Sequence, residues 1–204
     1  MNKKALLIVI VICSSIPFYA QDKGNRIEFG FAYGSGNEFK NRNYTYTNQY
    51  FKLQLYYKIK DTKRFKYELV LQPELNFAKH QLLNLYFVAP NEPDYEAKRE
   101  MYTKLKDVKE YVFNIGFLAR KPVFKSASIY VLGSIGPMIT DTETERLSKG
   151  FAFADVLAIG FTCKVNRITF DIRPNIRHIS NAGLQKKNSG YNTKNIDFGI
   201  LFSL

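Results

Sequence analysis

The stretch Arg167–Ser180, which reads RITFDIRPNIRHIS, alternates apolar and polar side chains along most of its length. Ile168, Phe170, Ile172 and Ile176 occupy even-numbered positions, whereas the odd-numbered positions from 167 to 177 hold arginine, threonine, aspartate and asparagine. Successive side chains of a β-strand point to opposite faces, so a repeat of two residues predicts a strand with one apolar and one polar face.

The same alternation recurs along the chain, and no helix-like apolar run follows the first twenty residues. The other segments with this pattern are Arg26–Ser35, Tyr50–Ile59, Phe65–Phe77, Tyr111–Ala119, Ala127–Met138, Phe151–Cys163 and Asn195–Leu204. Eight strands of about ten residues each correspond to the smallest transmembrane β-barrels.

The predicted connections alternate in length. Those after the second, fourth and sixth strands are short, namely Lys60–Arg64, Arg120–Ser126 and Lys164–Asn166, whereas those after the odd-numbered strands are longer. Short periplasmic turns alternating with long external loops are typical of outer-membrane barrels. We therefore expect an all-β fold, an eight-stranded antiparallel transmembrane β-barrel of the outer-membrane type.

Alternation alone does not say which face of the sheet points outward. The alternative is a soluble eight-stranded barrel of lipocalin type, whose apolar face lines the interior. Two features favour the membrane barrel: Phe and Tyr crowd the apolar face and the strand ends, and ionisable groups suited to a small polar lumen occupy the other face. Those groups are Glu68, Glu74, Asp171, Arg173 and Arg177.

The N-terminus has the features of a secretory signal peptide. Two lysines precede the apolar run Ala5–Ile12, which is too short to span a bilayer, and the small residue Ala20 follows it. We expect residues 1–20 to be a cleaved signal peptide and residues 21–204 to form a single barrel domain.

The chain is basic, with a formal net charge of +12. A basic secreted protein suggests contact with an anionic surface such as phosphate-bearing lipid or polysaccharide. No nucleic-acid-binding motif occurs, so a nucleic-acid partner is not expected. Cys163 is the only cysteine after the expected cleavage site, which leaves no intrachain disulfide.

His178 and Ser180 lie two residues apart at the end of the seventh predicted strand. Their Cβ atoms would be about 6.5–7 Å apart on one face, close enough for an imidazole to serve a hydroxyl as general base. Both continue the parity of the apolar face, so in a membrane barrel they would point toward lipid at the external rim. Polar groups in that position are costly unless they have a function. An ester-hydrolysing site for a lipid substrate would explain them.

The run His178–Leu184, followed by Asn188 and Gly190, resembles the PagL-type lipid A 3-O-deacylases, also known as acyloxyacyl hydrolases. The motif resemblance covers roughly Arg177–Asn192. It implies an outer-membrane barrel with a lipid-facing Ser-His-acid site that removes an ester-linked acyl chain from lipid A. The implied partner is lipopolysaccharide in the outer leaflet of the bacterial outer membrane.

The resemblance also implies residue roles. His178 corresponds to the general base and Ser180 to the nucleophile. Supporting and oxyanion-binding roles fall on Asn181, Ala182, Gly183 and Asn188. Apart from the resemblance, the basic loop residues Arg177, Lys186, Lys187 and Lys194 are candidates for contacts to lipid A phosphates. The alternative for each of them is an ordinary solvated loop charge.

One position departs from the family pattern. Asn192 stands two residues after Gly190, where the family has the glutamate of its triad. An amide can orient an imidazole, but it cannot stabilise the imidazolium by charge. We expect Asn192 as the third member of the site, with lower activity unless another acid substitutes. Asp197 has the wrong parity for that role.

The other residues considered for a catalytic or metal-binding role give weaker signals. His80 has no partner in view and is interpreted as an ordinary surface residue. No metal-ligand spacing occurs, and we expect neither a metal nor a cofactor. The competing function is a non-catalytic small outer-membrane barrel that contacts surfaces or partners through its long loops.

Overall fold

A computed structural model describes residues 26–203, and the predicted signal peptide, residues 1–20, lies outside this range. The division of the chain at residue 20 therefore stays a prediction. The described elements are β1 (Ile27–Glu38), β2 (Tyr44–Asp61), β3 (Lys66–Leu82), the 3-10 helix η1 (Leu85–Phe87), α2 (Tyr95–Thr103), β4 (Lys106–Pro122), β5 (Ala127–Ile135), β6 (Pro137–Thr140), β7 (Gly150–Val165), β8 (Ile168–Ser180) and β9 (Tyr191–Ser203).

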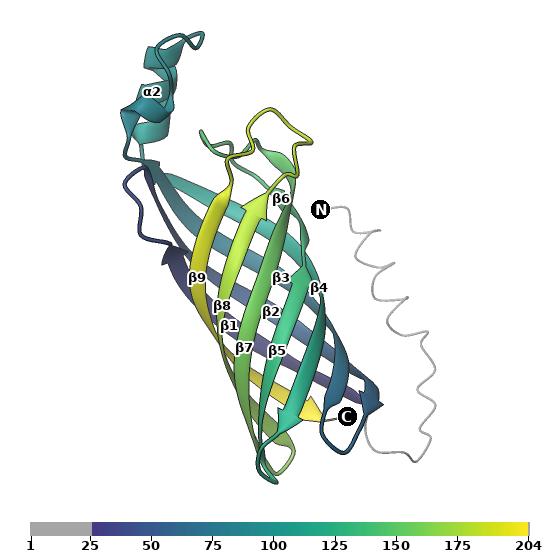
Figure 1. Ribbon diagram of the computed structural model, residues 1–204. Coiled ribbons are helices and arrows are strands. Elements are labelled where there is room, and N and C mark those ends of the chain that lie inside the picture. The colour runs from purple at the N-terminus through teal and green to yellow at the C-terminus, as the bar shows by residue number, and fades with distance from the viewer. Residues whose placement is uncertain (1–25, 204) are drawn as a thin grey trace, which may run out of the picture.

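The strands form one closed antiparallel barrel (Figure 1). Apart from β5 and β6, each strand pairs with its neighbours in the sequence, and β1 pairs with β9 to close the ring. β5 and β6 both pair with β4 and with β7, so together they occupy one position. The barrel therefore has eight strand positions, and the predicted fold class is confirmed.

The predicted strand Ala127–Met138 is interrupted at Gly136. A Cβ at this position would lie 2.6 Å from the Asn114 side-chain oxygen and 3.0 Å from the Ala154 carbonyl oxygen. Pro137, which has no N–H to donate, follows directly. Gly136 still exchanges two backbone hydrogen bonds with Ala154, at 3.0 and 2.8 Å, so the wall of the barrel stays closed.

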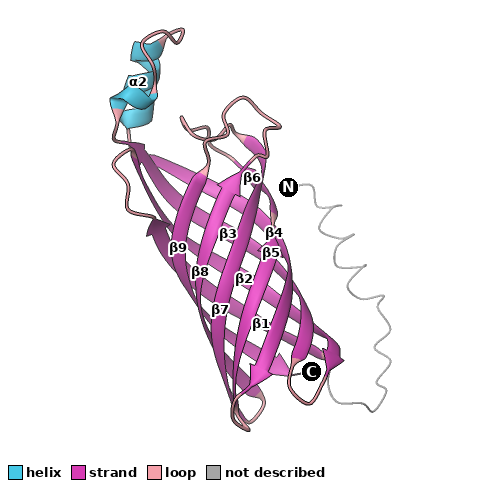
Figure 2. Ribbon diagram, in the orientation of Figure 1, coloured by secondary structure: helices cyan, strands magenta, loops and turns pink. Residues whose placement is uncertain are grey.

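The strands are strongly inclined to the barrel axis, as Figure 2 shows. The tilt follows from the strand register. Stepping from each residue to its direct partner on the next strand, once around the barrel, leads from Ala152 of β7 back to Thr162 of β7, ten residues away. Strands staggered by this amount must be tilted relative to the barrel axis. The path runs through Ala152, Met138, Val112, Glu74, Lys52, Ala32, Gly199, Asp171 and Thr162.

The two faces of the sheet are divided as the sequence predicts. In β8 the polar residues from Thr169 to Arg177 are buried in the lumen, whereas Phe170, Ile172 and Ile176 are exposed on the outside. Apolar side chains cover the outer surface and ionisable ones fill the interior. An interior of lipocalin type is therefore excluded.

The lumen is held together by ion pairs between strands that are distant in sequence. Arg177 lies 2.7 Å from Glu74, Arg120 2.8 Å from Glu68, and Lys52 3.0 Å from Asp197. Buried charges need such partners because each one loses its hydration.

Several tyrosines lie in the lumen, contrary to the expectation that tyrosine gathers on the outer face. Tyr46 donates to Glu110 at 2.8 Å and Tyr130 to Asp171 at 2.6 Å. Their hydroxyls satisfy buried carboxylates while their rings fill space. The inward-facing tyrosines are Tyr44, Tyr46, Tyr50, Tyr56, Tyr130 and Tyr191.

The connections divide between the two ends of the barrel (Figure 1). Short turns at 62–65, 123–126 and 166–167 lie at one end, and the longer connections 39–43, 83–105, 141–149 and 181–190 lie at the other. The 83–105 connection contains η1 and α2, which the sequence did not predict. Among the described residues, no helix has the length and apolar character needed to cross a bilayer.

The interpretation of His80 as a surface residue is wrong. Its side chain is fully buried, and Nε2 lies 2.8 Å from a carboxylate oxygen of Glu145. The ring also packs edge-on against Tyr191. Position 80 continues the lumen-facing parity of Glu74 and Asn76 along β3, but the partner Glu145 lies in a loop that the sequence alone does not place.

Candidate active site

His178 and Ser180 lie at the end of β8, on the side of the barrel where the long connections gather (Figure 1). His178 is exposed on the outer face, Ile179 is buried in the lumen, and Ser180 is partly exposed. His178 and Ser180 therefore share the parity of the outward-facing Ile176. The catalytic roles expected for them stay predictions.

The imidazole of His178 is held by Asn192. The two residues face each other across β8 and β9, and His178 Nδ1 lies 2.8 Å from Asn192 Oδ1. The amide oxygen can only accept, so the ring carries its proton on Nδ1 and presents a lone pair on Nε2. This is the tautomer that a general base needs.

Ser180 Oγ has no hydrogen-bond partner among the described residues, and Nε2 of His178 does not contact it in this conformation. A rotation about side-chain bonds can bring two groups at this spacing together. Gly190 lies beside the serine: a Cβ there would be 3.5 Å from Ser180 Cβ and 2.3 Å from the Ile179 carbonyl oxygen. Its φ of 61° is also a conformation that favours glycine.

The loop after Ser180 is folded by two asparagines. Asn181 is buried; its Nδ2 donates to the Lys187 carbonyl at 2.7 Å and its Oδ1 accepts from Gly183 N–H at 3.1 Å. The Asn188 side-chain oxygen accepts from Asn181 N–H at 2.7 Å. The Asn188 amide is thereby fixed beside the peptide that follows Ser180.

These contacts decide which donors the loop can offer to a ligand. The Gly183 N–H is already occupied by Asn181. Within the described residues, neither the Ala182 N–H nor Asn188 Nδ2 has an acceptor. Ala182 has a φ of 53°, which turns the chain sharply after the strand.

A cavity of about 250 Å³ opens on the outer face beside His178. Apolar side chains from three segments, among them Phe39, Leu157 and Ile176, surround its polar members. Those polar members include Asp155, which the sequence reasoning passed over. Its signal was visible, because Asp155 is an acid at an odd, otherwise apolar position of the Phe151–Cys163 alternation.

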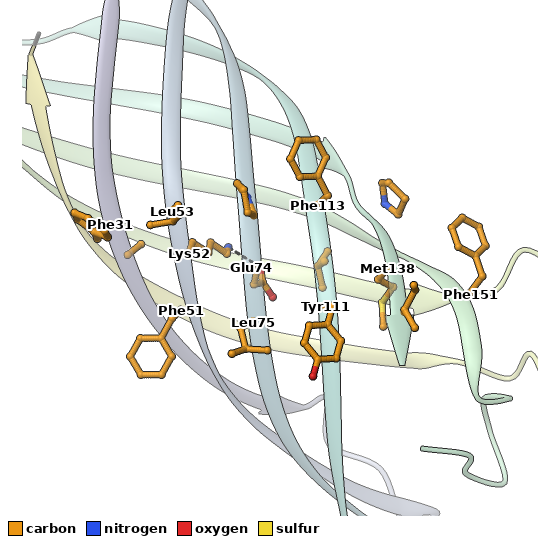
Figure 3. A pocket seen from close by; sticks show the side chains of 15 residues that line it. Phe31, Phe51, Lys52, Leu53, Glu74, Leu75, Tyr111, Phe113, Met138 and Phe151 are labelled. Atoms are coloured by element: carbon orange, nitrogen blue, oxygen red, sulfur yellow. Dashed lines mark ion pairs between the residues drawn. The ribbon is translucent and has the colours of Figure 1, made fainter. Parts of the chain in front are cut away.

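A larger furrow of about 710 Å³ crosses the outer faces of several strands (Figure 3). Phe31, Phe51 and Phe113 contribute to its apolar lining, and the Lys52–Glu74 pair, 3.5 Å apart, lies at its base. It contains no histidine, serine or cysteine. Its carboxylate, Glu74, is paired with Lys52 and so is not available as a free base. Despite its size, the furrow is therefore a weaker candidate site than the smaller cavity beside His178.

The loop that carries Asn188 is anchored to the other long connections. Lys187 Nζ donates to Glu143 at 2.6 Å and also contacts the Tyr102 hydroxyl of α2. The hydrogen bond from Lys187 is the main cause that lowers the pKa of Glu143. Burial would lower the pKa of Lys187, but the bonds to Glu143 and Tyr102 raise it above its ordinary value.

The expectation that Arg177 contacts lipid phosphates is wrong, because its side chain does not lie on the outer surface. Its guanidinium is buried in the lumen and bonded to Glu74. Lys187 is engaged at the rim, which leaves Lys186 and Lys194 as the exposed members of that predicted set. No cluster of potential metal ligands occurs within residues 26–203.

Comparison with family models matches residues 27–200 to Lipid A 3-O-deacylase (PagL). The chain belongs to the PagL family. The family match extends from β1 to β9, far beyond the Arg177–Asn192 motif that suggested it. No curated protein matches the chain in a sequence search.

Two solved outer-membrane proteins have a barrel similar to that of this chain. The crystal structure of the outer membrane enzyme PagL aligns with a TM-score of 0.50 at 12% identity, covering 84% of this chain and 97% of the other. Neisserial surface protein A aligns with a TM-score of 0.52 at 9% identity, covering 90% and 100%. At these identities the likeness shows the fold alone.

Proposed function

We propose that this chain is an outer-membrane esterase that removes an ester-linked acyl chain from lipid A, with Ser180 as nucleophile and His178 as general base. The observation that carries the proposal is the outward-facing His178, held by Asn192 in the tautomer of a base, two residues from an unengaged serine. Membership of the PagL family supports the substrate class.

The proposed reaction proceeds through an acyl-enzyme. Nε2 of His178 takes the Ser180 proton while Oγ attacks the ester carbonyl carbon. The resulting oxyanion accepts hydrogen bonds from Ala182 N–H and Asn188 Nδ2, the two donors that the loop leaves free. Collapse expels the sugar alkoxide, which takes the proton from His178.

Water completes the cycle. His178 removes a proton from a water molecule, the hydroxide attacks the acyl-Ser180 carbonyl, and the serine leaves with the proton. The products are a free fatty acid and lipid A with one acyl chain fewer. No cofactor enters the scheme.

The position of the site suits a membrane lipid. The cavity beside His178 is lined by Phe39, Leu157 and Ile176, which offer an apolar surface to an acyl chain. The long connections lie at the same end of the barrel, as on the external side of outer-membrane barrels. We therefore place the site at the level of the outer leaflet, with Lys186 and Lys194 available for lipid phosphates.

The test is hydrolysis of purified lipid A by the protein in detergent micelles, with the products identified by mass spectrometry. The proposal predicts loss of one acyl chain, and Ser180→Ala should reduce the rate by about a thousandfold or more. Ser189→Ala, in the same loop, is the matched control and should leave the rate unchanged. An inactive wild-type protein, or a fully active Ser180→Ala variant, contradicts the proposal and favours a non-catalytic barrel.

A further inference from the structure

Asp155 is an acidic side chain on the outer face of β7, between the outward-facing Phe153 and Leu157. It is exposed, and within the described residues its carboxylate has neither a hydrogen-bond donor nor a salt-bridge partner. A charged group on the lipid-facing surface of a barrel costs free energy, so its presence there calls for a functional explanation.

The strand register places Asp155 directly opposite His178. Asp155 pairs with His178 across β7 and β8, and His178 pairs with Asn192 across β8 and β9. Directly opposed residues on one face have Cβ atoms about 4.5–5.5 Å apart. The imidazole therefore has an amide on one flank and a carboxylate on the other, and all three line the same cavity.

We propose that Asp155 is a positioning residue that supplies the negative charge for the His178 imidazolium, while Asn192 supplies the orientation of the ring. The inference rests on the proposed esterase function. It divides between two residues the tasks that a single carboxylate performs in a Ser-His-acid triad. The chain can then dispense with an acid at position 192.

The charge on other nearby groups does not substitute for Asp155. Arg177 lines the cavity but is paired with Glu74 in the lumen. Lys194 is exposed on β9, opposite Ile176 and on the face of Asn192, and it is a cation. Of the described residues that line the cavity or adjoin it on this face, Asp155 alone carries negative charge.

The proposal is tested by kinetics as a function of pH for the wild type and Asp155→Asn. The carboxylate would stabilise the imidazolium that forms when His178 accepts the serine proton, and the amide of Asp155→Asn would not. Asp155→Asn should therefore lower kcat about tenfold with little change in KM. It should also move the acidic limb of the kcat/KM profile to lower pH, because the negative charge that faces the imidazole has been removed.

A second variant supplies the rescue. Adding Asn192→Glu to Asp155→Asn returns a carboxylate to the other flank of the imidazole, so it should restore kcat and return the acidic limb toward its original position. Heat-modifiable migration on gels verifies that each variant forms the barrel.

The inference would be overturned by an Asp155→Asn enzyme with unchanged kcat and pH profile, or by a loss confined to KM. A kcat loss that neither shifts the acidic limb nor responds to Asn192→Glu would also overturn it, since that is the behaviour of a structural role. Failure of the esterase proposal is distinguishable, because it appears as an inactive wild type or an active Ser180→Ala variant.

Discussion

In the proposed mechanism a single amide, that of Asn192, replaces part of a triad. Its oxygen lies 2.8 Å from His178 Nδ1, so it fixes the ring as an acid would, but without charge. Asn192→Glu should therefore retain full activity or increase it, since the new carboxylate adds stabilisation of the imidazolium. Asn192→Ala should lower kcat by at least about tenfold because the ring loses its orientation. Rates of lipid A hydrolysis measure both effects, and a Glu variant less active than the Ala variant would contradict the interpretation.

Gly190 is the second residue whose identity matters locally. Its φ is 61°, and an added Cβ would lie 2.3 Å from the Ile179 carbonyl oxygen. Gly190→Ala should displace the peptide beside Ser180, lower the hydrolysis rate and destabilise the barrel by about 1–3 kcal/mol. Gly183→Ala is the control, because its positive φ is similar but no atom lies near the added methyl group. Equal losses in activity for the two variants would argue against a specific role for Gly190.

At the scale of elements, the 181–190 connection depends on its contacts with α2 and the 141–149 connection. The hydrogen bond from Lys187 lowers the pKa of Glu143 below its ordinary value of 4.5. A carboxylate with a lowered pKa stabilises the folded state above its ordinary value, and this contribution is lost as the pH falls through the lowered value. The anchor of the connection should therefore be intact at neutral pH and lost in acid.

Hydrogen exchange tests this anchor. The Ser148 N–H, which donates to the Lys187 carbonyl at 3.3 Å, should lose protection as the pH falls below 4.5. Lys187→Met should show the same loss at neutral pH, whereas Lys186→Met should not. Protection that does not change between the wild type and Lys187→Met would show that the side chain has no part in holding the connection.

The elements also show where sequence reasoning succeeds and where it stops. The alternation in β8 predicted correctly which side chains face outward, because parity is a local property of a strand. The pairing of His178 with Asp155 was not predicted, since it depends on the register between β7 and β8. The His80–Glu145 pair was not predicted for a related reason: it joins the end of a strand to a loop whose position the sequence alone does not determine. Helix α2 lies in a connection without apolar periodicity, so it gave no signal.

For the whole molecule, stability depends on compensated charges in the lumen. Arg120 makes two hydrogen bonds to Glu68, at 3.0 and 2.8 Å, and a third to Thr162 at 2.8 Å. Arg120→Met leaves Glu68 buried without its partner and should lower the free energy of unfolding by about 3–5 kcal/mol. The double variant Arg120→Met/Glu68→Leu should recover most of this loss. Urea unfolding in lipid vesicles measures it, and a single variant as stable as the wild type would contradict the account of the lumen.

The functional account depends on the claim that the outward-facing His178 and Ser180 hydrolyse an ester of lipid A, and lipid A from living cells tests this claim most directly. Cells that produce the wild-type chain should yield lipid A lighter by the mass of one acyl group than cells that produce Ser180→Ala, as measured by mass spectrometry at equal levels of folded barrel. Identical lipid A from the two strains would contradict the account.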